Sequence, residues 1–273
     1  MAVTTTTDVI VPEVWGDLAA DEFIGKAVVF NSPATTTSDQ LVGIPGDTIK
    51  FPKWNLLNDL DDLTENVPMI PEKLTQTSSE ATIKEAGKAV EFTDSADLYG
   101  LGSPGDEARR QFGVLAARKV DGDLITAALA AGNLTAPAIT GALTWAGIVG
   151  GLAMFGDDWD PADFAGLYVR SDQVAQVMID DQFINAANTP NGNGIIQRGL
   201  LGAIAGLNVF VTNRIPTGKA FIARNGSLGA LYKRRPIVET DRDILNRSTV
   251  VTTNLHYATK RLKDTGVVEY TFN

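Results

Sequence analysis

The sequence predicts an α+β fold in which one long helix separates two groups of strands. Residues 103–131 carry the pattern of a single capped helix. Segments rich in alternating apolar and β-branched residues precede it in residues 48–92 and follow it in residues 206–272. The chain has 273 residues, 44% of them hydrophobic and 21% charged, which is typical of a globular protein with a substantial core.

The composition argues against several classes of function. The net charge of −10 disfavours a surface that neutralises many DNA phosphates. The chain has no cysteine and a single histidine, His256, so thiolate sites and two-histidine sites are excluded. Its most apolar stretch, residues 141–155, is too short to span a bilayer. We therefore expect no catalytic residue, no cofactor, no metal site and no membrane partner.

Four aspartates in one short segment are the candidates for a metal site or for a pair of catalytic carboxylates. Asp157, Asp158, Asp160 and Asp163 lack the spacing and the distal glutamate of a calcium loop. A glycosidase needs two carboxylates that converge across a cleft, and the candidates Asp157, Asp158 and Asp160 lie within a single turn. We interpret the cluster as a solvated turn with helix caps, and keep a carboxylate-dependent enzyme as an alternative.

Residues 1–30 predict an N-terminal arm. Pro12 is suited to open a short helix after a threonine run, and Trp15 and Phe23 then share an apolar face. Acidic residues occupy the opposite face. An arm with one apolar face calls for a surface to cover it.

Residues 31–97 predict a long two-stranded excursion. An outgoing strand around residues 48–54 is followed by a polar tip, and alternation over residues 81–92 predicts the return strand. A loop of this length in a compact domain normally has a function or a partner. Its leucines and acids are candidate contact residues: Leu56, Leu57, Leu60, Asp61, Asp62, Leu63 and Glu65.

The helix predicted for residues 103–131 has clear ends. Ser103 and Pro104 suit its start, and Gly132 and Asn133 suit its end. Apolar residues recur every three or four positions and are predicted to face the core: Phe112, Leu115, Ala116, Val120, Leu124 and Ala128. Basic residues are left for another surface: Arg109, Arg110, Arg118 and Lys119.

The remainder of the chain predicts a mixed domain followed by strands. Helices are predicted at residues 144–155 and 171–180, and strands at residues 164–169, 206–212 and 220–223. Alternation over residues 250–258 and a β-rich run at residues 267–272 predict closing strands, with the C-terminus held in a sheet.

Three segments in this order of parts carry a resemblance to a known family. They are GDTIKFPKW at residues 46–54, IAGLNVFVTNRIPTGKAFI at residues 204–222, and the closing segment at residues 234–272. The second is similar to a strand, Pro/Gly turn and return strand of the major capsid proteins of tailed bacteriophages, which have the Hong Kong 97-type fold. The resemblance implies this division: N-terminal arm 1–30, E-loop 31–97, peripheral domain with the spine helix 98–135, axial domain 136–235, and peripheral-domain strands 236–273.

The resemblance also implies a function. Copies of the chain would assemble in the host cytoplasm into pentamers and hexamers, which form the icosahedral shell of a virion around double-stranded DNA without sequence-specific binding. No long charged helical segment precedes the arm, which predicts a separate scaffolding protein; a portal and a decoration protein are further expected partners. The alternative within the virion is a tail-tube or decoration subunit.

The E-loop placement of that family suggests how neighbouring copies meet. The acidic tip would face Arg109, Arg110, Arg118 and Lys119 of an adjacent spine helix. Exposed ion pairs contribute only ~0.2–1 kcal/mol each, so the leucines of the tip are expected to carry more of the affinity.

Overall fold

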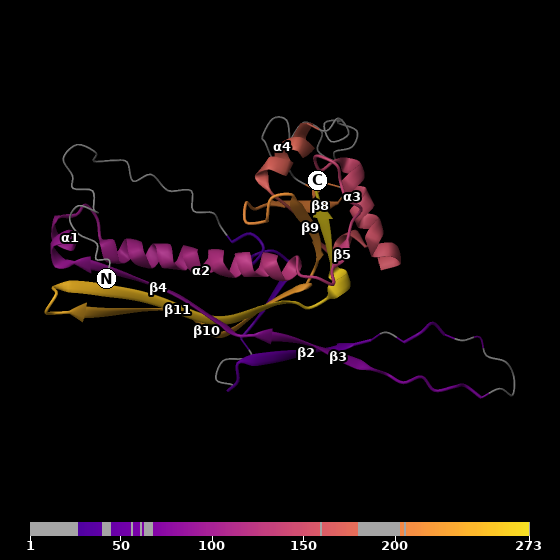
Figure 1. Ribbon diagram of the computed structural model, residues 1–273, viewed down its shortest axis with the longest axis horizontal. Coiled ribbons are helices and arrows are strands. Elements are labelled where there is room, and N and C mark those ends of the chain that lie inside the picture. The colour runs from indigo at the N-terminus through magenta and orange to yellow at the C-terminus, as the bar shows by residue number, and fades with distance from the viewer. Residues whose placement is uncertain are drawn as a thin grey trace.

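The computed structural model describes residues 27–39, 45–55, 57–60, 62, 68–158, 160–179, 203–204 and 206–272. Figure 1 shows three parts: a long helix lying along one sheet, a second α/β unit at the C-terminal end of that helix, and a hairpin that projects away from both. The predicted arm helix lies outside the described residues.

The long helix α2, Pro104–Ala128, forms between the predicted caps. The Ser103 hydroxyl accepts a hydrogen bond from the Asp106 N–H at 3.3 Å, and Pro104 occupies the first turn. A shorter helix, α1 at Asp94–Tyr99, precedes it. The buried apolar residues of α2 recur mainly every four positions: Ala108, Phe112, Ala116, Val120, Leu124, Ile125 and Ala128.

Leu115 was predicted to face the core, and that prediction is wrong. Its side chain is 38% exposed. The buried stripe follows a spacing of four through Phe112 and Ala116, which places Leu115 at the margin of the stripe. The helix also ends at Ala128, before the predicted end at residue 131.

A four-stranded sheet lies against α2. Its strands, in spatial order, are β1 (Thr35–Ser38), β10 (Leu228–Asp243), β11 (Ser248–Arg261) and β4 (Lys84–Thr93). Along β11, Val251, Thr253, Leu255 and Tyr257 are buried, whereas the residues that alternate with them are partly exposed. This period of two turns one face of the sheet toward the helix. β4 is an outer strand of the sheet.

A six-stranded sheet forms the second unit. Its spatial order is β5 (Leu134–Thr135), β12 (Val267–Thr271), β9 (Lys219–Arg224), β6 (Phe164–Val169), β8 (Leu207–Val211) and β7 (Ala203–Ile204). Among the described residues, these helices accompany it: α3 (Trp145–Leu152), α4 (Ser171–Ile179), and the short 3₁₀ helices η1 (Ala153–Asp158), η2 (Pro161–Asp163) and η4 (Asp264–Gly266). The strand predicted at residues 164–169 is confirmed, and it is buried throughout.

The strands divide between the sheets differently from the sequence-based division. The boundary predicted at residues 235/236 falls within β10, which pairs with β11 along most of its length. β12, expected among the peripheral-domain strands, instead lies beside β9 in the six-stranded sheet. Two register shifts between Tyr232 and Ile237 let β10 continue as one long irregular strand past Pro236.

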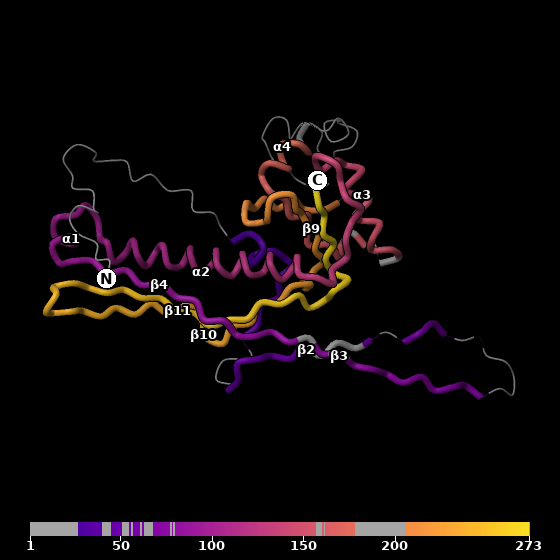
Figure 2. The backbone as a smooth tube through the Cα atoms, in the orientation of Figure 1, coloured from indigo at the N-terminus to yellow at the C-terminus, as the bar shows by residue number. Residues whose placement is uncertain are grey.

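The projecting hairpin confirms the predicted excursion, with a shorter return strand. β2 (Thr48–Trp54) pairs antiparallel with β3 (Gln76–Thr82). The alternation predicted as one return strand over residues 81–92 divides at Ile83, because the following residues pair with β11 as strand β4. Figure 2 shows the chain leaving the hairpin and running back beneath α2.

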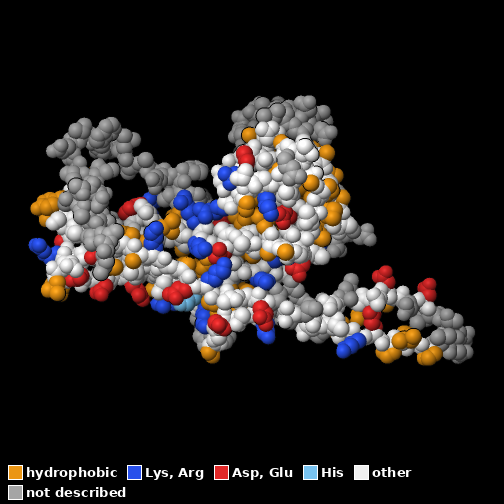
Figure 3. Space-filling view, viewed as in Figure 1, with side chains coloured by type: hydrophobic (Ala, Val, Ile, Leu, Met, Phe, Trp, Pro, Cys, Tyr) orange, Lys and Arg blue, Asp and Glu red, His pale blue; other side chains and the backbone are white. Residues whose placement is uncertain are grey.

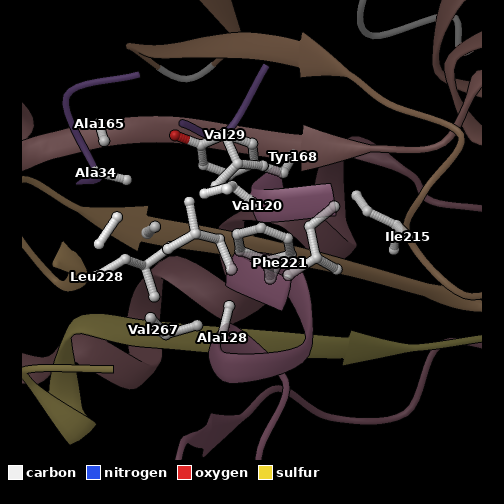
Figure 4. Close-up of a cluster of buried hydrophobic side chains, with 14 of the residues drawn as sticks. Val29, Ala34, Val120, Ala128, Ala165, Tyr168, Ile215, Phe221, Leu228 and Val267 are labelled. Carbon is white, nitrogen blue, oxygen red and sulfur yellow. The ribbon is translucent and has the colours of Figure 1, made fainter. Parts of the chain in front are cut away.

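One core joins the two units. Figure 4 shows Val120 and Ala128 of α2 packed with Phe221 and Val267 of the six-stranded sheet and with Leu228 of the four-stranded sheet. Tyr168 stacks between Phe210 and Phe221 with ring centroids 5.1 and 4.6 Å away. The helix and both sheets are therefore packed together as one body.

Candidate intersubunit interface

Two buried charged side chains, Asp121 and Arg261, join α2 to segments that are distant in the sequence. Asp121, fully buried on α2, accepts hydrogen bonds from the backbone N–H groups of Val29 and Phe30 at 2.7 and 3.0 Å. Because the carboxylate binds backbone rather than side chains, the first described residues of the chain are held against the spine helix.

Arg261 fixes the other end of α2. Its guanidinium donates to the carbonyl oxygens of Ala128 at 3.2 Å, Ala130, and Ala131 at 2.9 Å, and its Nε donates to Asp264 at 3.1 Å. A cation at a helix C-terminus satisfies carbonyls that have no partner within the helix and complements the helix dipole. Arg261 thus joins the end of β11 to the point where α2 meets the second unit. Sequence reasoning missed it, since the signal is a contact across more than 130 positions.

The hairpin presents two of the predicted leucines, Leu57 and Leu60, to solvent. Leu57 and Leu60 lie beyond the paired strands, and Leu60 is 100% exposed. Asp62 is also exposed. Leu56, Asp61, Leu63, Glu65, Trp15 and Phe23, the remaining predicted contacts of the tip and arm, lie outside the described residues.

Three further apolar side chains on the hairpin were missed. Met69, Ile70 and Leu74 are exposed, and Met69 and Ile70 lie between Pro68 and Pro71, the prolines that bound the predicted tip. Figure 3 shows hydrophobic side chains gathered on the outer part of the hairpin. Large apolar groups concentrated on a thin projection are typical of a surface that a partner covers.

Arg109 and Arg110 lie on the exposed side of α2 but already have acidic partners on the same helix. Arg109 pairs with Asp106 at 3.0 Å, and Arg110 pairs with Glu107 at 2.7 Å. Hydrogen bonds from Arg110 and then from Gln111 lower the pKa of Glu107 to about 2. These pairs reduce the net charge that this turn of the helix offers to another copy.

Lys119 belongs to a different group, near the hairpin root. Its Nζ lies 3.3 Å from Asp123, which also lies 3.5 Å from Lys84 and accepts a 2.5 Å hydrogen bond from the Tyr257 hydroxyl. Burial alone would raise the pKa of Asp123, but the Tyr257 hydrogen bond and the two lysine charges outweigh it and hold the pKa below its usual value. Arg118 is half-buried, and its backbone carbonyl accepts a hydrogen bond from Arg214 at 2.8 Å.

A second exposed apolar surface lies at the opposite end of the molecule. Leu98, Tyr99 and Leu101 on and after α1 are exposed, as are Ile244 and Leu245 in the turn between β10 and β11. A 2.8 Å ion pair between Arg242 and Asp94 ties the two segments together. In the sequence these residues are isolated apolar positions. Only the fold shows that α1 and the turn between β10 and β11 lie together at one end of the molecule.

The aspartate cluster has structural roles where it is described. The Asp160 carboxylate accepts a hydrogen bond from the Ala162 N–H at 2.9 Å, and Asp163 pairs with Arg224 at 3.0 Å. Within the described ranges, no group of His, Asp and Glu is arranged to hold a metal ion. Among the same residues, no helix is both long and apolar enough to cross a membrane.

Comparisons with known proteins show the family of the chain. The family model described as phage capsid protein matches residues 76–270, from β3 to β12. The chain belongs to this family. The major capsid protein of Staphylococcus phage phiMR11 is similar to this capsid protein, with 29% identity over 270 residues, 98% of this chain and 96% of that protein.

Solved phage capsids share the fold of this capsid protein at low sequence identity. The capsid of cyanophage P-SCSP1u superposes with a TM-score of 0.76 at 13% identity, covering 98% of this chain and 94% of that chain. Mycobacterium phage Che8 gives a TM-score of 0.75 at 14% identity, covering 96% and 97%. The cyanophage Pam1 capsid gives 0.74 at 16% identity, covering 96% of each. The predicted family and the predicted Hong Kong 97-type α+β fold are confirmed.

Proposed function

We propose that copies of this capsid protein form pentamers and hexamers that close into an icosahedral shell around double-stranded DNA, as the major capsid protein of a tailed bacteriophage. The observation that carries the proposal is the β2–β3 hairpin. It leaves the body of the chain with Leu60 fully exposed and with Met69 and Ile70 also largely exposed, and a neighbouring copy would cover these groups.

The acidic tip of the hairpin supplies the predicted contact between copies. In this proposal, Asp61, Asp62 and Glu65 face the basic side of an adjacent α2. Arg109 and Arg110 already pair within their own helix, so exchange with a neighbour's acids would contribute little net free energy. The charges would set register and partner choice, while the leucines contribute most of the affinity.

Further partners follow from the same proposal. A separate scaffolding protein would guide assembly in the host cytoplasm, a portal would replace one pentamer, and a decoration protein would bind the finished shell. The net charge of −10 suits a wall that encloses DNA without binding a particular sequence.

Negative-stain electron microscopy combined with sedimentation tests the proposal. The chain is expressed alone and together with the virion proteins encoded beside it. We expect closed shells of uniform curvature, or pentamers and hexamers, in at least the second preparation. A stable monomer in both preparations would contradict the proposal, and tubes or isolated rings would favour the tail-tube alternative.

A further inference from the structure

Three arginines meet where α2 joins the second unit. Arg214, in the loop between β8 and β9, donates through Nη1 to the backbone carbonyl of Arg118 on α2 at 2.8 Å. Arg170, between β6 and α4, donates to the carbonyl oxygens of Asn213 and Ile215, the two neighbours of Arg214 in the loop, at 3.1 Å each. Figure 3 shows Lys and Arg side chains gathered over this junction. We call these three residues, which are distant in the sequence, the arginine row.

Two members of the row have no acid to neutralise them. Within the described residues, neither Arg118 nor Arg214 has a carboxylate at ion-pair distance. The Nε of Arg118 is enclosed without a hydrogen-bond partner, so its Nη groups are the part of the guanidinium that reaches solvent. Arg170 has Asp172 at 3.7 Å. Neighbouring guanidinium groups of this kind are stabilised by an anion that comes from outside the chain.

The opposite side of the four-stranded sheet is acidic. Odd-numbered residues of β11, such as Val251 and Leu255, pack toward α2, so the even-numbered residues face away from it. The strand pairing places four acids beside these even-numbered residues: Glu85, Glu91, Glu239 and Asp241. The net charge of −10 therefore conceals a basic surface on the α2 side, and a polyanion would be repelled from the other side.

We propose that the arginine row binds the phosphates of double-stranded DNA, a contact that rests on the proposed shell function and names the residues of the wall that touch the enclosed DNA. A guanidinium group donates two parallel hydrogen bonds to a phosphate, and several of them in a row suit the repeating charge of a DNA strand. Phosphate contacts carry no sequence information. Two or three contacts per copy make the binding weak and sensitive to salt, so the wall holds DNA without retaining it.

An acidic protein segment is the other partner that arginines could bind. The most exposed large apolar residues lie away from the row, at the hairpin and at the turn between β10 and β11: Leu60, Ile70 and Leu245. Affinity between proteins depends on apolar and aromatic anchors at the centre of the contact. A basic surface set apart from such anchors is better suited to phosphates, whose binding depends on charge.

Fluorescence anisotropy with a labelled DNA duplex of arbitrary sequence tests the proposal. The full-length, unassembled chain is titrated into the duplex from about 50 mM salt upward. Arg118→Gln combined with Arg214→Gln is expected to weaken binding about fivefold or more, and to reduce the slope of log affinity against log salt by about 1.8.

The matched control is Arg234→Gln combined with Arg242→Gln. It removes the same charge from arginines of β10 that pair with Glu239 at 3.4 Å and with Asp94 at 2.8 Å. We expect it to change the affinity by less than about twofold. Arg118→Lys combined with Arg214→Lys keeps the charge and should retain the salt slope, which separates loss of phosphate contacts from loss of folding, and circular dichroism checks the fold of every variant.

Each outcome decides the proposal. Undetectable binding by the unsubstituted chain, unchanged binding by the glutamine variant of the row, or equal weakening by the control would overturn it. Competition by polyglutamate as strong as by unlabelled DNA of equal charge would assign the row to an acidic protein and also overturn it. Shells that form while the row proves dispensable for DNA would leave the shell function intact. Binding that depends on the row, without shells under any condition, would support the row and contradict the shell function.

Discussion

Arg261 illustrates how a single side chain connects the parts of this capsid protein. It is almost fully buried and donates to three carbonyls at the end of α2 as well as to Asp264. Arg261→Ala leaves these carbonyls without a donor and opens a void beside Gly132, so we expect a loss of about 2–4 kcal/mol in the free energy of unfolding. Urea unfolding followed by circular dichroism measures it. The neighbouring Lys260→Ala, the matched control, should change stability by no more than about 0.5 kcal/mol.

The lowered pKa of Asp123 predicts that the free energy of unfolding decreases at acidic pH. Its pKa in the folded chain is lowered from 3.8, so its contribution to stability is present above that value and is lost as the pH falls through and below it. Asp123→Asn is therefore expected to destabilise the chain most at neutral pH and progressively less on acidification. Unfolding free energies of both proteins between about pH 7 and pH 2.5 check this. A difference between them that stays constant over the whole range would contradict the assignment.

At the scale of elements, the hairpin and the helix respond to substitution in opposite ways. Leu60 is fully exposed, so Leu60→Ser should leave the thermal midpoint within about 1 °C while weakening association between copies. Leu124 is fully buried on α2, and Leu124→Ala should cost about 2–5 kcal/mol of folding free energy. Calorimetry and sedimentation velocity on both variants separate the two effects. If Leu60→Ser associated as strongly as the unsubstituted chain, the proposed role of the hairpin tip in association between copies would be contradicted.

Local signals explain which elements were predictable. Ser103, Pro104 and the spacing of Phe112, Ala116 and Val120 define α2 within one stretch of sequence. The split of residues 81–92 at Ile83 was not predictable, because both parts alternate and only pairing with β2 or β11 assigns them to different sheets. The same holds for β12, whose place beside β9 depends on partners more than 40 positions away.

Candidate contacts were predictable only where composition was unusual. A leucine- and aspartate-rich tip bounded by prolines stands out in the sequence, and Leu57, Leu60 and Asp62 are indeed exposed there. The tip formed by Leu98 and Leu245 joins residues almost 150 positions apart, so no local pattern marks it. The open edge of β4 likewise follows from sheet order rather than from its own sequence.

At the scale of the whole molecule, the most exposed of the large apolar residues lie at the extremities and the core lies between them. The hairpin projects from one end, the α1 tip lies at the other, and a single cluster of buried side chains joins α2 to both sheets. A monomer of this shape leaves its largest apolar projections in water. In the proposed shell, neighbouring copies would cover these projections without altering the core.

Hydrogen exchange read by mass spectrometry tests that claim most directly. Exchange at residues 55–75 is compared between the dissociated chain and purified assembled particles, with the buried strand β6 as an internal reference. We predict that these residues exchange at least tenfold more slowly in the particles, while β6 is unchanged, because a neighbouring copy covers the hairpin. Equal exchange at residues 55–75 in both states would contradict the claim that a neighbour completes the hairpin.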